Sequence, residues 1–93
     1  MEISKVRVSN LNSPAGNPAP NQFWITLEGV GHYFQSYSTL IAFMDFMGNV
    51  ILDENAWDYS TTTGKYRNIF LGEKRAETEK KIKSGEYKLA DLN

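Results

Sequence analysis

The segment Thr61–Lys65, TTTGK, is the part of the sequence that comes nearest to a phosphate-binding loop. Such a loop needs a glycine five residues before the Gly-Lys pair and a Ser or Thr directly after the lysine, because backbone amides hold the phosphates and the hydroxyl binds magnesium. Tyr59 and Tyr66 occupy these two positions. The motif fails at both, so we do not expect nucleotide hydrolysis.

The same segment is typical of the start of a helix. Side-chain oxygens of Asp58, Ser60 and Thr61 can accept hydrogen bonds from the first free amides, so we predict a helix cap made by these three residues. The apolar residues that follow recur at helical spacing and predict a buried helix face of Tyr66, Ile69 and Phe70. A helix start with exposed hydroxyls beside Lys65 and Arg67 could also bind a nucleic-acid phosphate.

Residues for acid–base or nucleophilic catalysis are few. His32 is the single histidine, cysteine is absent, and no nucleophile-elbow pattern occurs. Asp53, Glu54 and Asp58 form a candidate acidic patch, which could imitate phosphates, but their spacing lacks the ligands and central glycine of a calcium loop. We therefore expect no catalytic residues, no metal site, no cofactor and no enzymatic activity.

Aromatic and basic residues make a more promising surface. Trp24 and Phe34 come from adjacent arms of one predicted hairpin, and on a free sheet face they could stack on bases or anchor a protein partner. The alternative is that helices or a partner subunit cover them. The candidate binding surface consists of Trp24, Phe34, Tyr37, Lys65, Tyr66 and Arg67.

Length and charge limit the class of protein. The 93 residues carry a net charge of −1, with +1 in residues 1–10, −5 in 11–60 and +3 in 61–93. The basic last third is compatible with nucleic-acid binding, but a near-neutral total weakens non-specific affinity. No signal-peptide core and no run of about 18 apolar residues occurs, so we expect one cytoplasmic domain over residues 1–93 and no membrane contact.

Strand patterns fill the first half of the chain. Residues 5–10 alternate as a half-exposed strand, and the proline-rich residues 13–20 predict a long connection. Residues 23–28 and 32–37 predict a hairpin around Gly29–Gly31, with Phe23, Ile25 and Leu27 on one face and Trp24 on the other. Residues 39–47 fit a strand or a short helix, and we favour strands joined around Gly48.

Helical patterns fill the second half. We predict helices near 60–71 and 74–84, each followed by a glycine suited to a left-handed cap, and the pairs Glu77–Lys81 and Glu79–Lys83 in the second helix. Residues 86–93 fit a short edge strand or a docked tail. The fold class is α+β: a small antiparallel sheet of about four to five strands within residues 3–53, followed by two short C-terminal helices packed on it.

Several segments together resemble a family of small phage proteins of unknown function. The segments are YFQSYSTLIA, GNVILD, WDYSTTTGKYRNIFLGE and ETEKKIKSGEY, and the pattern W-D-Y-S-x-T-T-x-K-Y-x-x-x-F-L is the most specific part. The resemblance covers roughly residues 33–88. It implies a viral accessory gene expressed in the cytoplasm of an infected bacterium, and it implies no catalytic residues.

Three functions are compatible with these observations. The favoured hypothesis is a non-enzymatic phage accessory protein that binds or inhibits a host protein, for example a defence component. The first alternative is a small nucleic-acid-binding protein that uses the basic last third and the aromatic strand face. The second alternative is a structural or self-assembling phage component, with a homodimer formed through an open sheet edge or the aromatic face.

Overall fold

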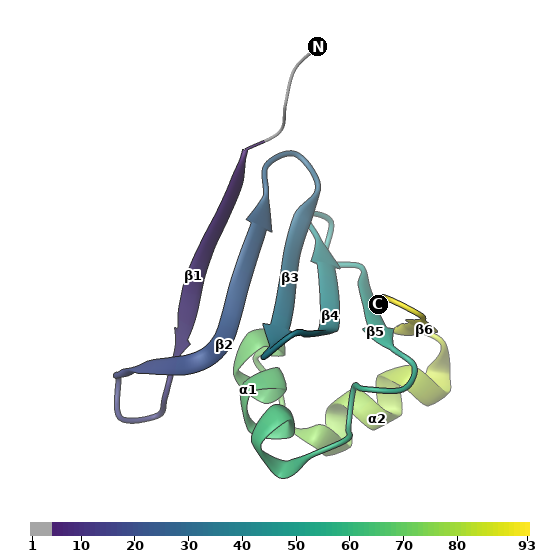
Figure 1. The fold of residues 1–93 in the computed structure, drawn as a ribbon. Coiled ribbons are helices and arrows are strands. Elements are labelled where there is room, and N and C mark those ends of the chain that lie inside the picture. Colours follow the sequence, from purple (N-terminus) through teal and green to yellow (C-terminus); the bar gives the residue numbers. More distant parts are fainter. Residues whose placement is uncertain (1–4) are drawn as a thin grey trace.

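The computed structural model describes residues 5–93 as one six-stranded sheet, with strands in sequence order, and two helices against it (Figure 1). The α+β class is confirmed. The sheet is mixed because a sixth, C-terminal strand pairs in parallel with the fifth, whereas we expected four or five antiparallel strands. The elements are β1 (Val6–Asn12), β2 (Pro18–Leu27), β3 (Gly31–Ser36), β4 (Thr39–Asp45), β5 (Val50–Asp53), α1 (Thr61–Leu71), α2 (Arg75–Ser84) and β6 (Lys88–Ala90).

The first two strands form a hairpin, and β2 begins earlier than the prolines led us to expect. Strand β3 pairs with β2 only from Gln22 onward. Pro18 and Pro20 therefore lie in the part of β2 that has β1 as its sole neighbour. Their missing N–H groups cost no hydrogen bond to β3, so the strand tolerates both prolines.

Residues 39–47, which fitted a strand or a helix, form β4 and the turn after it. Asp45 fixes that turn, because its carboxylate accepts hydrogen bonds from the N–H groups of Met47 and Asn49, each at 2.9 Å. The side-chain amide of Asn49 also donates to this carboxylate, and these bonds lower the pKa of Asp45. The strand interpretation with a turn around Gly48 is confirmed.

Both helices lie where the sequence predicts them. Ser60 is the N-cap of α1, and its hydroxyl accepts a hydrogen bond from the N–H of Thr63 at 3.1 Å. Gly72 and Gly85 end α1 and α2 in the left-handed conformation.

Helix α1 decides which face of the sheet becomes the core. The ring of Phe70 lies 4.8 Å from that of Trp24 and 5.9 Å from that of Phe34. Near the helix start, the hydroxyls of Ser36 and Thr63 are 3.4 Å apart. The side of the sheet that carries Trp24 and Phe34 is therefore the covered side.

The C-terminal residues close the other edge of the sheet. Asp53 on β5 accepts hydrogen bonds from the backbone N–H of Leu92 and the side-chain amide of Asn93. That amide also donates to the carbonyl oxygen of Leu40, and the side-chain oxygen of Asn93 accepts from the Leu40 N–H. Burial opposes the charge on Asp53, but these bonds outweigh it and lower the pKa of Asp53.

Candidate functional site

The structure does not bring the predicted binding surface together on the outside of the protein. Phe34 is 0% exposed, Tyr66 8% and Arg67 1%, so the expectation that all six residues share an accessible surface is wrong. Trp24 is half-buried beneath Phe70. The physical reason is that α1 lies on this side of the sheet and takes these aromatic rings into the core. Tyr37 and Lys65 are the two members that remain exposed.

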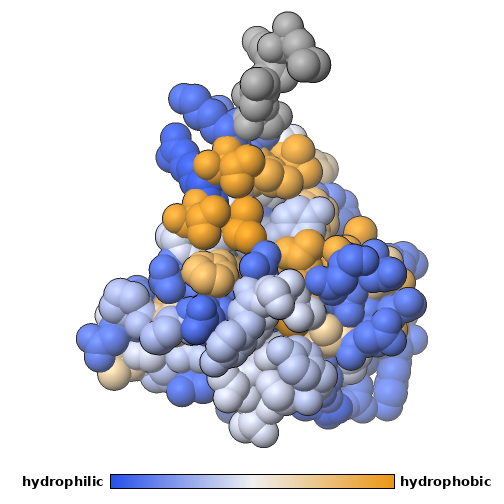
Figure 2. Space-filling view, in the orientation of Figure 1, coloured by the Kyte–Doolittle hydropathy of each residue, from blue (hydrophilic) through white to orange (hydrophobic). Residues whose placement is uncertain are grey.

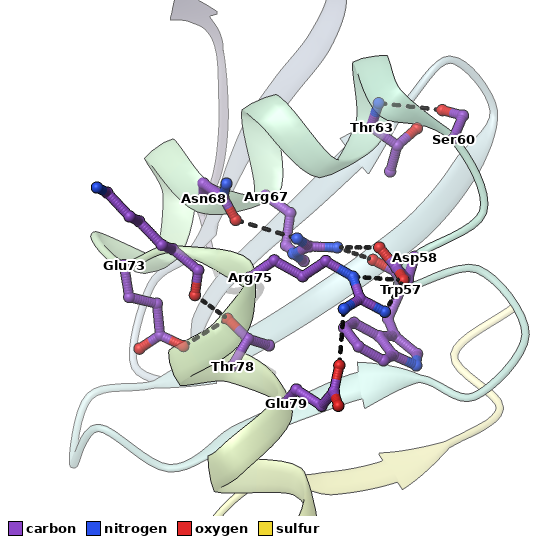
Figure 3. Close-up of polar contacts among 11 residues, drawn as sticks. Trp57, Asp58, Ser60, Thr63, Arg67, Asn68, Glu73, Arg75, Thr78 and Glu79 are labelled. Atoms are coloured by element: carbon purple, nitrogen blue, oxygen red, sulfur yellow. Dashed lines mark hydrogen bonds and ion pairs between the residues drawn. The ribbon is translucent and has the colours of Figure 1, made fainter.

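Arg67 is held in place by a dense set of polar contacts (Figure 3). Its Nη1 donates to the carbonyl oxygen of Trp57 at 2.6 Å and to Oδ1 of Asp58 at 3.1 Å. Its Nη2 donates to Oδ1 of Asn68 at 3.0 Å, and its guanidinium lies 5.2 Å from the ring centre of Trp57. Arg67 therefore ties α1 to the loop before it and is not available to a partner.

Asp58 joins the two helices and does not cap α1. Its Oδ2 accepts hydrogen bonds from Arg75 on α2, which also pairs with Glu79 (Figure 3). Hydrogen bonding by Arg75, and then by Arg67, lowers the pKa of Asp58 against the opposing effect of burial. Of the three predicted cap residues Ser60 caps the helix, while Thr61 is its first residue.

An open cleft of about 690 Å³ lies at the start of α1, where the sequence suggested phosphate binding. Arg67 and Arg75 line it, but Asp58 lines it too and is paired with both guanidinium groups. Lys65 is the remaining cation of the lining, and its ammonium lies over the ring of Tyr66 at 5.5 Å. The cleft is therefore weakly basic, and the electrostatic attraction that it offers a phosphate is small.

The predicted acidic patch is also absent as a surface. Asp53 is 2% exposed and bonded to the C-terminal residues, and Asp58 is committed to Arg67 and Arg75. Glu54 is exposed. Within residues 5–93 no three His, Asp or Glu side chains gather in a way that could hold a metal ion.

A second buried polar cluster, around Glu73, did not emerge from the sequence. The Glu73 carboxylate, 4% exposed, accepts hydrogen bonds from Lys81, the Thr78 hydroxyl and the Tyr87 hydroxyl at 2.6–2.8 Å. Burial opposes the negative charge of Glu73, yet these donors lower its pKa. Burial and the nearby Glu73 raise the pKa of Tyr87 to about 12. Lys81 thus pairs with Glu73 and not with Glu77 as predicted.

The side of the sheet opposite α1 is apolar and lacks a second layer within the described residues. Strand alternation and the pairing register place one set of side chains there. Val6 and Val8 are 58% and 60% exposed, and the others are half-buried by their neighbours. We call this surface the open sheet face; its apolar residues are Val6, Val8, Phe23, Ile25, Leu27, Tyr33, Phe43 and Ile51. The register also places two uncharged polar residues on it, Asn10 and Gln35, on either side of Phe23.

Among residues 5–93, charged side chains on this side of the sheet lie at the borders of the open sheet face. The register places Asp45 at one end of β4 and Lys88 on the far edge strand. Figure 2 shows hydrophobic residues gathered over β1 and β2, in the upper part of the view. In the centre, the rings of Tyr33 and Phe43 lie 4.7 Å apart. The sequence showed the alternation in β2, but not which of its two sides the helices would leave uncovered.

None of the helices in residues 5–93 is long and apolar enough to cross a membrane. Comparison with curated proteins and with solved structures finds no match. One protein family, described as a family of unknown function (DUF8033), matches residues 5–86, which is most of the chain and includes both helices. The chain therefore belongs to this family of unknown function.

Proposed function

We propose that this chain is a non-enzymatic phage accessory protein, a small binding module that engages a protein of the infected bacterium through the open sheet face. The observation that carries the proposal is the apolar, centrally uncharged character of that face. The phage origin rests on the resemblance of the segment from Trp57 to Leu71, and the bacterial cytoplasm is the compartment that this origin implies.

The size of the open sheet face fits a protein partner. Five strands spaced about 4.8 Å apart are roughly 24 Å wide, and six residues of strand are about 20 Å long, which gives each partner about 480 Å² of flat contact. Two partners together would then bury on the order of 1,000 Å², the area at which specific protein interfaces begin. Tyr33 and Phe43 lie centrally on this face and belong to a residue class that often anchors interfaces.

A nucleic acid fits this surface less well. Phosphates attract proteins through lysine and arginine, and the centre of the open sheet face has neither. On the helices, four of the basic side chains of the last third are engaged in ion pairs with carboxylates: Arg67, Arg75, Lys81 and Lys83. These pairs reduce the positive potential that a nucleic acid would meet.

One ring nitrogen of the single histidine, His32, contacts side chains of the neighbouring strand. Nδ1 of His32 accepts a hydrogen bond from the indole N–H of Trp24 at 3.1 Å and lies 3.0 Å from the hydroxyl of Thr26. A general base needs a free ring nitrogen within reach of a nucleophile. These contacts occupy Nδ1, so Nε2 is the ring nitrogen left for that role.

The test is affinity capture from a bacterial host lysate at physiological salt, with tagged wild-type chain and two lysine variants. Ile25→Lys places a charge in the open sheet face. Ile69→Lys places the same charge on α1, at an apolar residue that is already 40% exposed. We expect a protein that the wild type and Ile69→Lys retain equally and that Ile25→Lys retains at least tenfold less.

Circular dichroism of the purified variants is the control that checks that both remain folded. Equal capture of the same protein by Ile25→Lys would place the contact elsewhere and contradict the proposal. Loss of all wild-type binding after nuclease treatment of the lysate would favour the nucleic-acid alternative.

A further inference from the structure

Strand β1 is an unprotected edge of the sheet. It has seven residues, contains neither proline nor lysine, and pairs regularly with β2 from Val6 to Asn10. The opposite edge, β6, has three residues and is followed by the bonded C-terminal tail. Proteins normally shorten, charge or cover a sheet edge, because free backbone groups there pair with other strands. Among the described residues β1 has no such protection beyond Arg7.

The hydrogen-bond pattern identifies the backbone groups that point away from the sheet. The N–H of Glu28 donates to the carbonyl of Lys5 at 3.0 Å, which makes these residues a hydrogen-bonded pair of the antiparallel ladder. Such pairs alternate with non-bonded ones. The N–H and C=O groups of Val6, Val8 and Asn10 therefore point outward, and the side chains of the two valines belong to the open sheet face.

We propose that two copies of this chain pair through β1, antiparallel and about a two-fold axis at Val8. In this register Val8 lies opposite Val8 of the second copy, and Val6 lies opposite Asn10 of the second copy. All outward N–H groups of the three residues then meet outward C=O groups. A second copy therefore supplies a hydrogen-bond partner for each of these outward groups, because a two-fold axis brings the same strand of both copies together.

The side chains in this register are compatible with self-pairing. Arg7 lies opposite Ser9 of the second copy, and Lys5 lies opposite Leu11 of the second copy, so no like charges face each other. Opposed valines are favourable cross-strand neighbours. The two open sheet faces become one continuous apolar surface on a twelve-stranded sheet, which would present twice the contact area to a partner.

Cysteine cross-linking tests the register, because the natural chain contains no cysteine. Cα atoms of a hydrogen-bonded antiparallel pair lie about 5.5 Å apart, within the span of a disulfide. Val8→Cys should therefore form a disulfide-linked dimer under mild oxidation. Ile25→Cys, on the neighbouring strand and the same face, is the control and should remain monomeric on a non-reducing gel.

Sedimentation of the purified full chain gives the second measurement. We expect the wild type to sediment at twice the mass of one chain. Val8→Pro removes one outward N–H without breaking a bond to β2, and it should give a folded monomer, while Val8→Thr keeps the N–H and should stay dimeric. If Val8→Pro fails to fold, Val8→Lys sets two ammonium groups opposite each other and should give the same monomer.

A wild type that stays monomeric at all concentrations would overturn the proposal. Cross-linking of Ile25→Cys as efficient as that of Val8→Cys would also overturn it, since it would indicate face-to-face packing. Both measurements use the purified chain alone, so their failure is separate from failure of host-protein capture.

Discussion

The indole ring of Trp24 lies 4.8 Å from the phenyl ring of Phe70, and this contact sets α1 on one side of the sheet. Phe70 also stacks on Phe34, which is fully buried. The two contacts make Phe70 the residue through which α1 is anchored. Because α1 packs on this side, the opposite, apolar side of the sheet has no covering element among residues 5–93.

Phe70→Ala should reduce the free energy of unfolding by about 3–5 kcal/mol, because it opens a cavity between α1 and the sheet. The measurement is urea denaturation followed by circular dichroism. Ile69→Ala is the control on the same helix; its side chain is 40% exposed, and we expect a loss below about 1 kcal/mol. Equal losses in the two variants would contradict the orientation of α1.

Arg67→Met should destabilise the chain by about 3 kcal/mol, because the guanidinium is buried and its removal leaves the Trp57 carbonyl and the Asp58 carboxylate without this donor. The Arg75–Asp58 pair remains and limits the loss. Lys65→Met, two positions earlier and exposed, should change stability by less than about 0.5 kcal/mol. Thermal denaturation compares the two, and a neutral Arg67→Met would show that the cluster in Figure 3 is dispensable.

The pKa of Glu73 is lowered in the folded protein relative to its ordinary value of 4.5. The unfolded chain therefore binds more protons as the pH falls below about 5, and the stability that Glu73 contributes above that pH is lost as the pH falls through its folded pKa. In Glu73→Gln the free energy of unfolding should depend less steeply on pH over this acid range. Urea titrations at several pH values measure the slope, and identical slopes would exclude the role of Glu73.

Gly31→Ala should cost at least about 3 kcal/mol or prevent folding. A Cβ atom at this position would lie 2.8 Å from Cα of Asp45 and would overlap the carbonyl oxygen of Met44, and the φ angle is +154°. Gly16→Ala, at φ +85° with no atom within 4 Å of the added Cβ, should cost about 1–2 kcal/mol from backbone strain alone. Equal costs, measured by thermal denaturation, would contradict the close approach of β4 to β3.

The sequence determined most of the secondary structure because its signals are local. Glycine at residues 72 and 85 ends the helices, Ser60 starts the first one, and alternation marks β2 and β3. The Gly-Lys pair at residues 64–65 was also interpretable locally, since a phosphate loop requires particular neighbours that are missing. These features depend on residues only a few positions apart, and tertiary contacts did not overturn them.

The tertiary structure alone decided which residues are accessible. One side of β2 carries Phe23, Ile25 and Leu27, and the other carries Trp24 between Gln22 and Thr26. The alternation alone would favour the first side as the core, but the contact of Trp24 with Phe70 shows that α1 covers the second. Arg67 looks like a free basic residue in the sequence, but Trp57 and Asp58 reach it from the preceding loop and bury it. Long-range packing decides which face of the sheet is covered and which partners a side chain meets. The candidate binding surface is therefore the open sheet face and not the set of aromatic and basic residues that the sequence suggested.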